Sequence, residues 1–163
     1  SLKSPLQRNE ATMASGNFTL FSKNKDDIRI NDLALATVKM ALISSAWTPD
    51  SSVTGNSVWA DISANEVSGN GWTAGGETLA SLAATAISGG FKFSSASPSK
   101  TASGGSIPAF RYAVMYVSGT LWSMSNPLIG YFVGDSTPAD IPATTTGNAL
   151  TLTCPAGGWF DIT

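Results

Sequence analysis

The chain has 163 residues, a formal net charge of −2 and no histidine. At this length about 68–70% of the unfolded surface can be buried, which supports one hydrophobic core and argues against a second full domain. The low share of charged residues, 12%, leaves Ser, Thr, Asn and Gly to form most of the polar surface. Because nucleic-acid affinity rests on clustered Lys and Arg, the acidic balance and the scattered basic residues exclude a phosphate-tracking surface.

The lack of histidine removes the usual base or ligand of serine, cysteine and zinc hydrolases. The single cysteine, Cys154, cannot form an internal disulfide, and we expect a buried, inert thiol in a reducing compartment. No P-loop, dinucleotide fingerprint or calcium-loop spacing occurs, so we expect no cofactor and no metal. No bilayer-spanning apolar run or signal-peptide layout is present, which predicts a soluble, cytosolic product.

The N-terminal region, residues 1–33, is expected to form an extended arm followed by a first short strand. Residues 1–16 mix charges with weakly spaced apolar side chains, and residues 18–22 favour a strand. We expect residues 34–163 to form the folded domain. Some apolar side chains of the N-terminal region fall outside the sandwich pattern and are the predicted subunit-interface residues, because such groups need a partner to cover them. They are Leu2, Leu6, Phe18 and Phe21.

The middle of the chain predicts strands with one helical turn. Residues 37–45 alternate apolar with polar or small side chains, the period of two that predicts a half-buried strand. Residues 58–64 predict a short helical turn that Ser57 caps, with Asp61 on its exposed side. Residues 79–87 fit helical spacing as well as strand spacing, and the glycine pairs on both sides favour a strand.

Residues 111–117 and 128–133 are apolar on both faces, which predicts two central strands joined antiparallel by a wide hairpin loop. Residues 135–148 predict an exposed loop. Residues 149–154 and 159–163 alternate in polarity, and we expect the chain to end as a hairpin. The sequence therefore predicts an all-β fold: a mainly antiparallel β-sandwich or jelly-roll-like barrel, with a short helical turn and an extended N-terminal arm.

Carboxylate pairs are the remaining candidates for catalysis, since glycosidases need two acids about 5–10 Å apart. Asp61, Glu66 and Glu77 lie in one aromatic-bearing region of the sequence. No local pattern marks one of them as buried, so we predict that the chain is not an enzyme. A glycan-binding module is a separate hypothesis, because aromatic rings stack on sugars; it rests on Trp59, Trp72 and Trp122.

Several stretches resemble, in the same order, a broad group of small virion proteins of tailed bacteriophages. They are TVKMALISSAWTPD, SVWADISANEVSGNGWTAGGETLAS, RYAVMYVSG and NPLIGYFVGDS, with the closing LTLTCPAGGWFDIT. The second stretch is the most specific, because its glycines permit positive φ in a tight loop while a tryptophan pins that loop to the sheet. These loop-ordering residues are Gly69, Gly71, Trp72, Gly75 and Gly76. The likeness covers residues 35–163 and does not extend to residues 1–33.

The resemblance implies a non-catalytic β-sandwich, present in many copies on a particle and without an active site to carry over. The leading expectation is a capsid decoration, or cement, protein of the virion, assembled in the host cytoplasm. Its partners would be the major capsid protein, copies of itself as a homo-oligomer, or other virion proteins, with no nucleic-acid or membrane partner. The alternatives are a tail, neck or fibre-attachment protein with the same sandwich, or a host-glycan-binding module.

Overall fold

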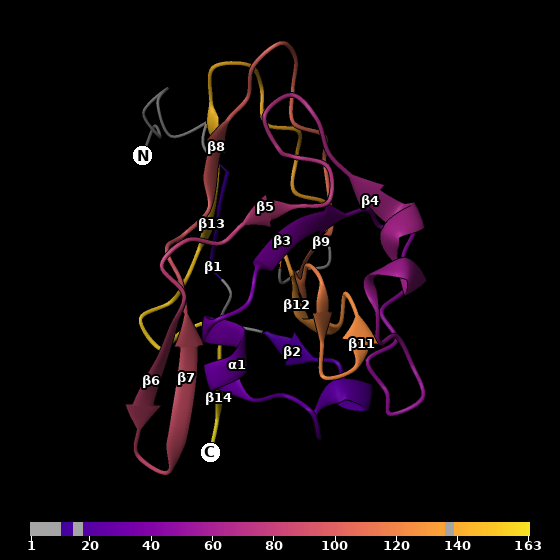
Figure 1. Cartoon of the computed structure of the whole chain (residues 1–163). Helices are drawn as coiled ribbons and strands as arrows, with labels where there is room; N and C mark the ends of the chain where they lie inside the picture. Colours follow the sequence, from indigo (N-terminus) through magenta and orange to yellow (C-terminus); the bar gives the residue numbers. More distant parts are fainter. Residues whose placement is uncertain (1–10, 15–17, 136–138) are drawn as a thin grey trace.

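The computed structural model describes residues 11–14, 18–135 and 139–163. Within them the chain folds as mostly antiparallel β-sheets with one short helix, α1 (Ile30–Ala34), which confirms the predicted all-β class (Figure 1). Across the same residues, no helix combines the length and the apolar character that crossing a membrane requires.

The strands are short and are separated by turns. Their bounds in chain order are β1 (Ala11–Ala14), β2 (Thr19–Leu20), β3 (Val38–Ile43), β4 (Glu66–Val67), β5 (Glu77–Thr78), β6 (Ala83–Ile87), β7 (Gly90–Ser94), β8 (Ser99–Thr101), β9 (Tyr112–Val117), β10 (Thr120–Leu121), β11 (Met124–Ser125), β12 (Leu128–Val133), β13 (Ala149–Thr153) and β14 (Phe160–Ile162). Three-residue 3-10 turns lie at Ser22–Asn24, Trp59–Asp61 and Ser63–Asn65.

The main sheet has the strand order β2-β12-β9-β3-β4, and β5 also pairs with β3. The predicted central pair is confirmed, because β9 and β12 lie side by side and antiparallel. The prediction that β3 is half-buried is wrong, since every residue of β3 except Lys39 is buried. The alternation in its sequence is misleading because Ala41 and Ile43 face a second apolar layer instead of solvent.

One face of the main sheet packs on two smaller sheets, of strand orders β1-β13-β8 and β14-β7-β6, and this contact forms the larger core (Figure 1). Met40 and Met115 of the main sheet belong to the same buried cluster as Phe93 of β7, Leu152 of β13 and Trp159. Strands of separate sheets thus meet through their apolar faces, as in a sandwich.

The opposite face of the main sheet is covered by loops and 3-10 turns rather than by strands. Its cluster combines Ala41 and Val114 of the sheet with Phe21, Trp47 and Ile62. Phe21 follows β2, and the other two come from the segment between β3 and β4. A long, irregular segment therefore has a packing function, because it closes the second face of the sheet.

Residues 18–33 pack as part of the sandwich body. β2 pairs antiparallel with β12, Ile30 and Leu33 belong to the larger core, and α1 contacts β6 and β7. The body therefore extends N-terminally past the domain boundary expected after residue 33. Within residues 1–16, the structure describes only β1, which pairs in parallel with β13.

The C-terminal hairpin prediction is wrong. β13 pairs with β1 and β8, whereas β14 pairs with β7 in a different sheet. Gly158, with φ +85°, redirects the chain so that the side chain of Trp159 enters the core at 2% exposure. The backbone N–H of Trp159 donates to the carbonyl of Phe93 at 2.8 Å. Burial of this large ring decides the chain direction more strongly than the short turn does.

Two ambiguous segments resolve clearly. The strand interpretation of residues 79–87 is confirmed for β6, which pairs antiparallel with β7. The helical turn expected at residues 58–64 is present as two 3-10 turns. The residue at the N-cap position is Val58 rather than Ser57. The side chain of Asp61, the last residue of the first turn, reaches back, and its Oδ2 accepts the backbone N–H groups of Ser57 at 2.9 Å and Val58 at 3.1 Å.

Gly130 in β12 lets an aromatic ring lie on the sheet, and Gly130→Ala should disturb that contact. A Cβ at this position would overlap the ring of Phe18 and would lie 2.7 Å from the carbonyl oxygen of Thr19. We expect the free energy of unfolding to fall by about 1–3 kcal/mol in a denaturant titration, because overpacking forces neighbours to move.

The matched control is Gly157→Ala, where a Cβ has open space and the change should stay within about 0.5 kcal/mol. Combining Gly130→Ala with Phe18→Ala should give a smaller loss than the sum of the two single losses, since the clash with the ring is removed and only the close approach to the carbonyl oxygen of Thr19 remains. Additive losses would contradict the assigned contact.

Candidate functional site

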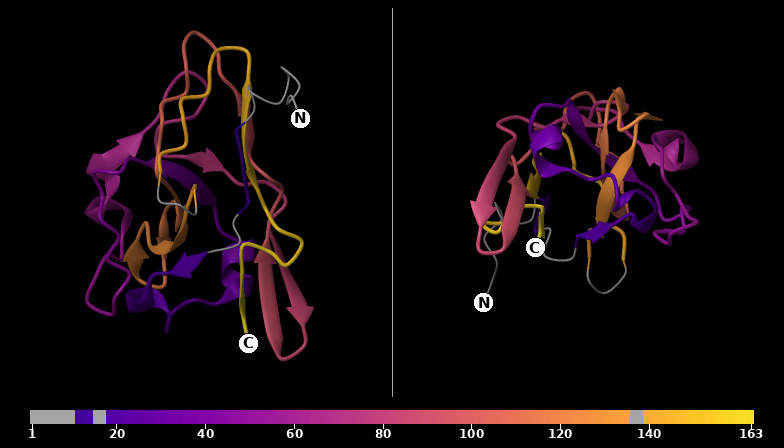
Figure 2. Two further views of the ribbon diagram at one scale, coloured as in Figure 1. Left: turned by 180° about the vertical axis from the view of Figure 1, so that it is seen from behind. Right: turned by 60° about the horizontal axis from the view of Figure 1, so that its bottom comes forward.

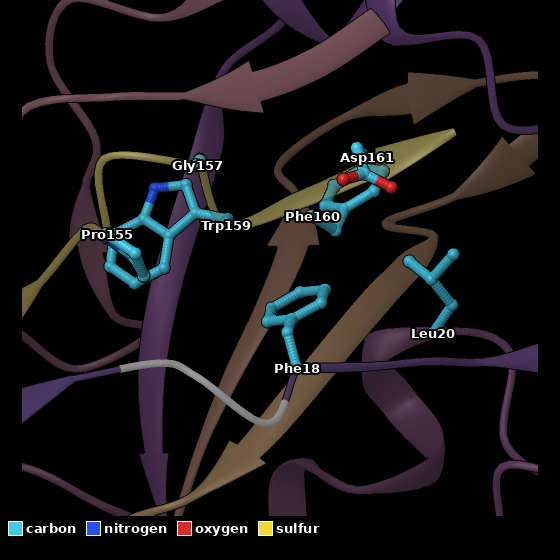
Figure 3. A pocket seen from close by; sticks show the side chains of 8 residues that line it. Phe18, Leu20, Pro155, Gly157, Trp159, Phe160 and Asp161 are labelled. Atoms are coloured by element: carbon cyan, nitrogen blue, oxygen red, sulfur yellow. The ribbon is translucent and has the colours of Figure 1, made fainter. Parts of the chain in front are cut away.

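A groove opens where the N-terminal strand β2 approaches the C-terminal strand β14. It encloses about 380 Å³ and is lined by Phe18, Leu20, Pro155, Gly157, Gly158, Trp159, Phe160 and Asp161 (Figure 3). Phe18 stacks on Phe160 with ring centroids 5.4 Å apart and an interplanar angle of 10°. Among these lining residues Asp161 alone carries an ionisable side chain, so the groove combines aromatic side chains and polar backbone groups with one carboxylate.

The predicted subunit-interface residues have different fates. Phe18 is partly buried and lines this groove, whereas Leu2 and Leu6 lie outside the described residues. The prediction that Phe21 lies in a subunit interface is wrong. Phe21 is 0% exposed and packs against Trp47 and Tyr131. Its backbone N–H donates to the carbonyl of Ile129 at 3.1 Å, so the chain turns inward after β2 and the ring needs no partner subunit to cover it.

The glycine-rich loop between β4 and β5 has the geometry that the sequence analysis expects. Its four glycines, Gly69, Gly71, Gly75 and Gly76, have φ angles of +111°, +127°, +84° and +94°, and Trp72 is 1% exposed. At Gly76 an added Cβ would lie 2.7 Å from the carbonyl oxygen of Met40. The loop therefore depends on glycine both for its backbone angles and for its close approach to β3.

Two of the candidate catalytic carboxylates accept hydrogen bonds from the backbone of the loop between β4 and β5. Glu66 Oε2 accepts the N–H of Gly75 at 2.8 Å, and Glu77 Oε1 accepts the N–H of Thr73 at 2.7 Å. Lys100 adds an ion pair to the other oxygen of Glu77 at 3.5 Å. Both acids thus order the same loop that the glycines shape.

The register places these two acids on opposite faces of the main sheet. Glu66 is paired with Ile43 and Glu77 with Met40, and directly opposed residues of neighbouring strands share a face. Ile43 belongs to the smaller core and Met40 to the larger one. The two carboxylates therefore do not face each other across a common cleft, as the acid pair of a glycosidase must.

Glu66 lies in a half-buried electrostatic cluster with Tyr116 and Lys39. Burial raises the pKa of Glu66, while the N–H of Gly75 and the charge of Lys39 act in the opposite direction. Burial and the neighbouring Glu66 charge raise the pKa of Tyr116 to about 12. The hydroxyl of Tyr116 donates to the carbonyl of Gly75, so the neutral phenol serves as a fixed donor to the loop.

The tryptophans proposed for glycan binding do not gather on one surface. Trp59 stacks on Tyr116 at 4.4 Å and 8° on the side of the smaller core. Trp72 is buried, and its Nε1 has no hydrogen-bond partner in the structure. Trp122 packs against the larger core and donates to Asp32 Oδ2 at 2.9 Å. A shared sugar-stacking platform does not result.

Asn24 and Cys154 lie where their residue types alone do not place them. Asn24, in the 3-10 turn after β2, is 1% exposed, and its Nδ2 donates to the carbonyls of Ser57 and Leu128, both at 2.8 Å. Cys154 was expected to be buried and is only partly so. In the sequence, only the absence of a charge on the Asn24 side chain is consistent with its burial.

Comparisons with models of protein families, with curated proteins and with solved structures find no match. Within residues 11–14, 18–135 and 139–163, no group of three or more His, Cys, Asp or Glu could hold a metal ion. The described geometry therefore defines an all-β sandwich whose candidate acids order a loop, together with an aromatic-lined groove beside β2 and β14.

Replacing Glu77 tests whether this acid supports the loop. Glu77→Ala should lower the free energy of unfolding by about 1–3 kcal/mol, because it removes the acceptor of the Thr73 N–H in a buried position. Glu77→Gln keeps an oxygen acceptor and should lose less. Lys100→Met removes a partner whose side chain is 48% exposed and should change stability by at most about 1 kcal/mol. Equal losses for Glu77→Ala and Glu77→Gln in a urea titration would contradict this function of the carboxylate.

The pH dependence of stability tests the environment of Glu66. Because its pKa is raised above the ordinary 4.5, its stabilising contribution is complete below that value and is lost as pH rises through the raised pKa. Glu66→Gln cannot ionise and escapes this loss. From about pH 4 to about pH 7 the stability of the variant relative to the unsubstituted chain should therefore increase. Parallel curves from denaturant titrations across this range would contradict the assignment.

Proposed function

We propose that the chain is a non-enzymatic structural protein of a tailed-bacteriophage particle, and specifically a head decoration protein that binds neighbouring coat subunits. The likeness of residues 35–163 to small virion proteins of such phages motivates the proposal. The observation that carries it structurally is the use of the candidate acids: Glu66 and Glu77 bind loop amides on opposite faces of the sheet. A scaffold fits this arrangement better than a site of catalysis does.

The proposed mechanism is the burial of interface area repeated over many copies. Both faces of its main sheet are covered, so a well-packed body carries the exposed loops that would contact the coat. Each contact with the coat can be modest, since a protein held at one contact meets the next at high effective concentration. The surface of Ser, Thr, Asn and Gly suits a close, weakly charged contact.

A tail, neck or fibre-attachment protein is the alternative from the same class, and the same sandwich serves it equally well. The glycan-binding hypothesis has less support, because Trp72 is buried while Trp59 and Trp122 pack with different clusters. A glycan array separates this hypothesis from the structural ones, since the decoration proposal predicts no sugar-dependent binding.

Co-sedimentation of the purified chain with heads that lack it tests the proposal directly. We expect saturable binding to heads and none to isolated tails; the reverse would support the tail alternative, and sugar-dependent binding alone would support the glycan-binding one. The double variant Leu2→Ser/Leu6→Ser should weaken head binding at least about a hundredfold, because each leucine side chain that the proposed interface buries would contribute about 1.5–3 kcal/mol.

The control is Thr146→Ala, which changes an exposed polar side chain in the described structure and should leave head binding unchanged. Unaltered binding by the double variant would remove Leu2 and Leu6 from the interface. Failure of the unsubstituted chain to bind heads at all would overturn the proposal.

A further inference from the structure

β6 is the outer strand of the sheet β14-β7-β6. It lies at the outside of the molecule in each view, with no described segment beyond it (Figures 1 and 2). Its pairing with β7 runs from Ala83↔Ser94 to Ile87↔Gly90 and uses one edge only. Along the other edge, alternate N–H and C=O groups point away from β7 and form a template for a further strand.

This edge lacks the features that usually prevent strand addition. Residues 81–90, SLAATAISGG, contain no charged residue and no proline, and the register with β7 has no shift that would mark a bulge. The other described edge strands are shorter, and four of them carry a charge: Glu66 in β4, Glu77 in β5, Lys100 in β8 and Asp161 in β14. Among the described strands β6 is therefore the edge best suited to pair with another chain.

We propose that β6 pairs antiparallel with β6 of a second copy of this chain, about a twofold axis at Thr85. This register sets Thr85 opposite its own copy, Ala84 opposite Ala86, and Ala83 opposite Ile87. Each pair joins residues of the same parity, so outward backbone groups meet outward groups. Opposed threonines are a favourable cross-strand pair, and no like charges meet. The proposal concerns a self-association surface and does not depend on the proposed head binding.

The same register places an exposed apolar pair in one row with core residues of the partner copy. Phe91 and Ile162 are directly opposed in β7 and β14 and are 44% and 39% exposed. They share a face with Phe93 and Phe160, which lie in the core. In the paired sheet the row Ile162, Phe91, Ala86 of one copy continues into Ala84, Phe93, Phe160 of the other. The exposed end of each hairpin thus lies beside the covered end of its partner.

The geometry favours a second copy of the chain over an unrelated strand because the segment is complementary to itself. A twofold contact of this kind is isologous: the same surface is used by both copies. Each copy has one unpaired β6 edge, and that edge becomes fully paired in the dimer. Association through β6 therefore stops at two copies. Two three-stranded sheets would then form one continuous sheet across the axis.

Introducing a charge at the twofold axis tests whether the dimer forms. In sedimentation velocity and light scattering, the unsubstituted full chain should form dimers. Thr85→Lys and Thr85→Glu should each raise the dimer dissociation constant at least about tenfold, because like charges then meet across the axis. An equimolar mixture of the two variants should restore dimers, now as Lys–Glu heterodimers. Circular dichroism of each variant alone establishes that it is folded.

The matched control is Thr101→Lys, which places a lysine on the exposed edge strand β8 and should leave the dimer intact. A monomeric unsubstituted chain, dimers that survive Thr85→Lys, or a mixture that stays monomeric would each overturn the inference. A monomeric chain that binds heads would overturn only the β6 pairing, while a dimer that fails to bind heads would overturn only the proposed function.

Discussion

The fold depends on a sheet whose central strands are apolar on both faces. β3, β9 and β12 expose almost no side chain, so each face must be covered by other parts of the chain. Two small sheets cover one face, and the segment between β3 and β4, with Phe21, covers the other. The short strands and long connections follow from this requirement, because coverage needs apolar side chains in suitable places rather than regular structure.

The loop between β4 and β5 lies against β3 of that sheet, and this position explains its glycines and its hydrogen bonds to carboxylates. The loop runs so close to β3 that Gly76 has no room for a side chain, and its amides need acceptors where water is partly excluded. Glu66 and Glu77 supply those acceptors from either side of the sheet. The Tyr116 hydroxyl supplies a matching donor. Residues that look catalytic in the sequence are thereby committed to backbone structure, which favours the scaffold proposal.

The sequence predicts the fold best where local pattern and burial agree. β9 and β12 are apolar throughout, so their central position and antiparallel pairing are predictable. The burial of both faces of β3 is not predictable, because the alternation of polarity in one strand carries no information about a second apolar layer. The C-terminal hairpin fails for a related reason: Trp159 gains more from the distant core than β14 would gain from pairing with β13. Long-range burial decides both cases.

The candidate site was only partly predictable. The positive φ angles at Gly69, Gly71, Gly75 and Gly76 follow from residue type, since glycine adopts them at little cost. The separation of Glu66 and Glu77 onto opposite faces needs the register with β3, which no local pattern contains. Burial of Phe21 and Asn24 likewise depends on β12 from a distant part of the chain. The groove beside Phe18 joins both ends of the chain and could not be read from either one.

Head decoration, as proposed, requires many copies of this chain on each particle. Quantitative mass spectrometry of purified particles, with the major coat protein as internal standard, measures that copy number. Head decoration predicts a simple, fixed ratio to the coat protein. A copy number matching the tail or neck would contradict head decoration, and absence from the particle would contradict a virion function altogether.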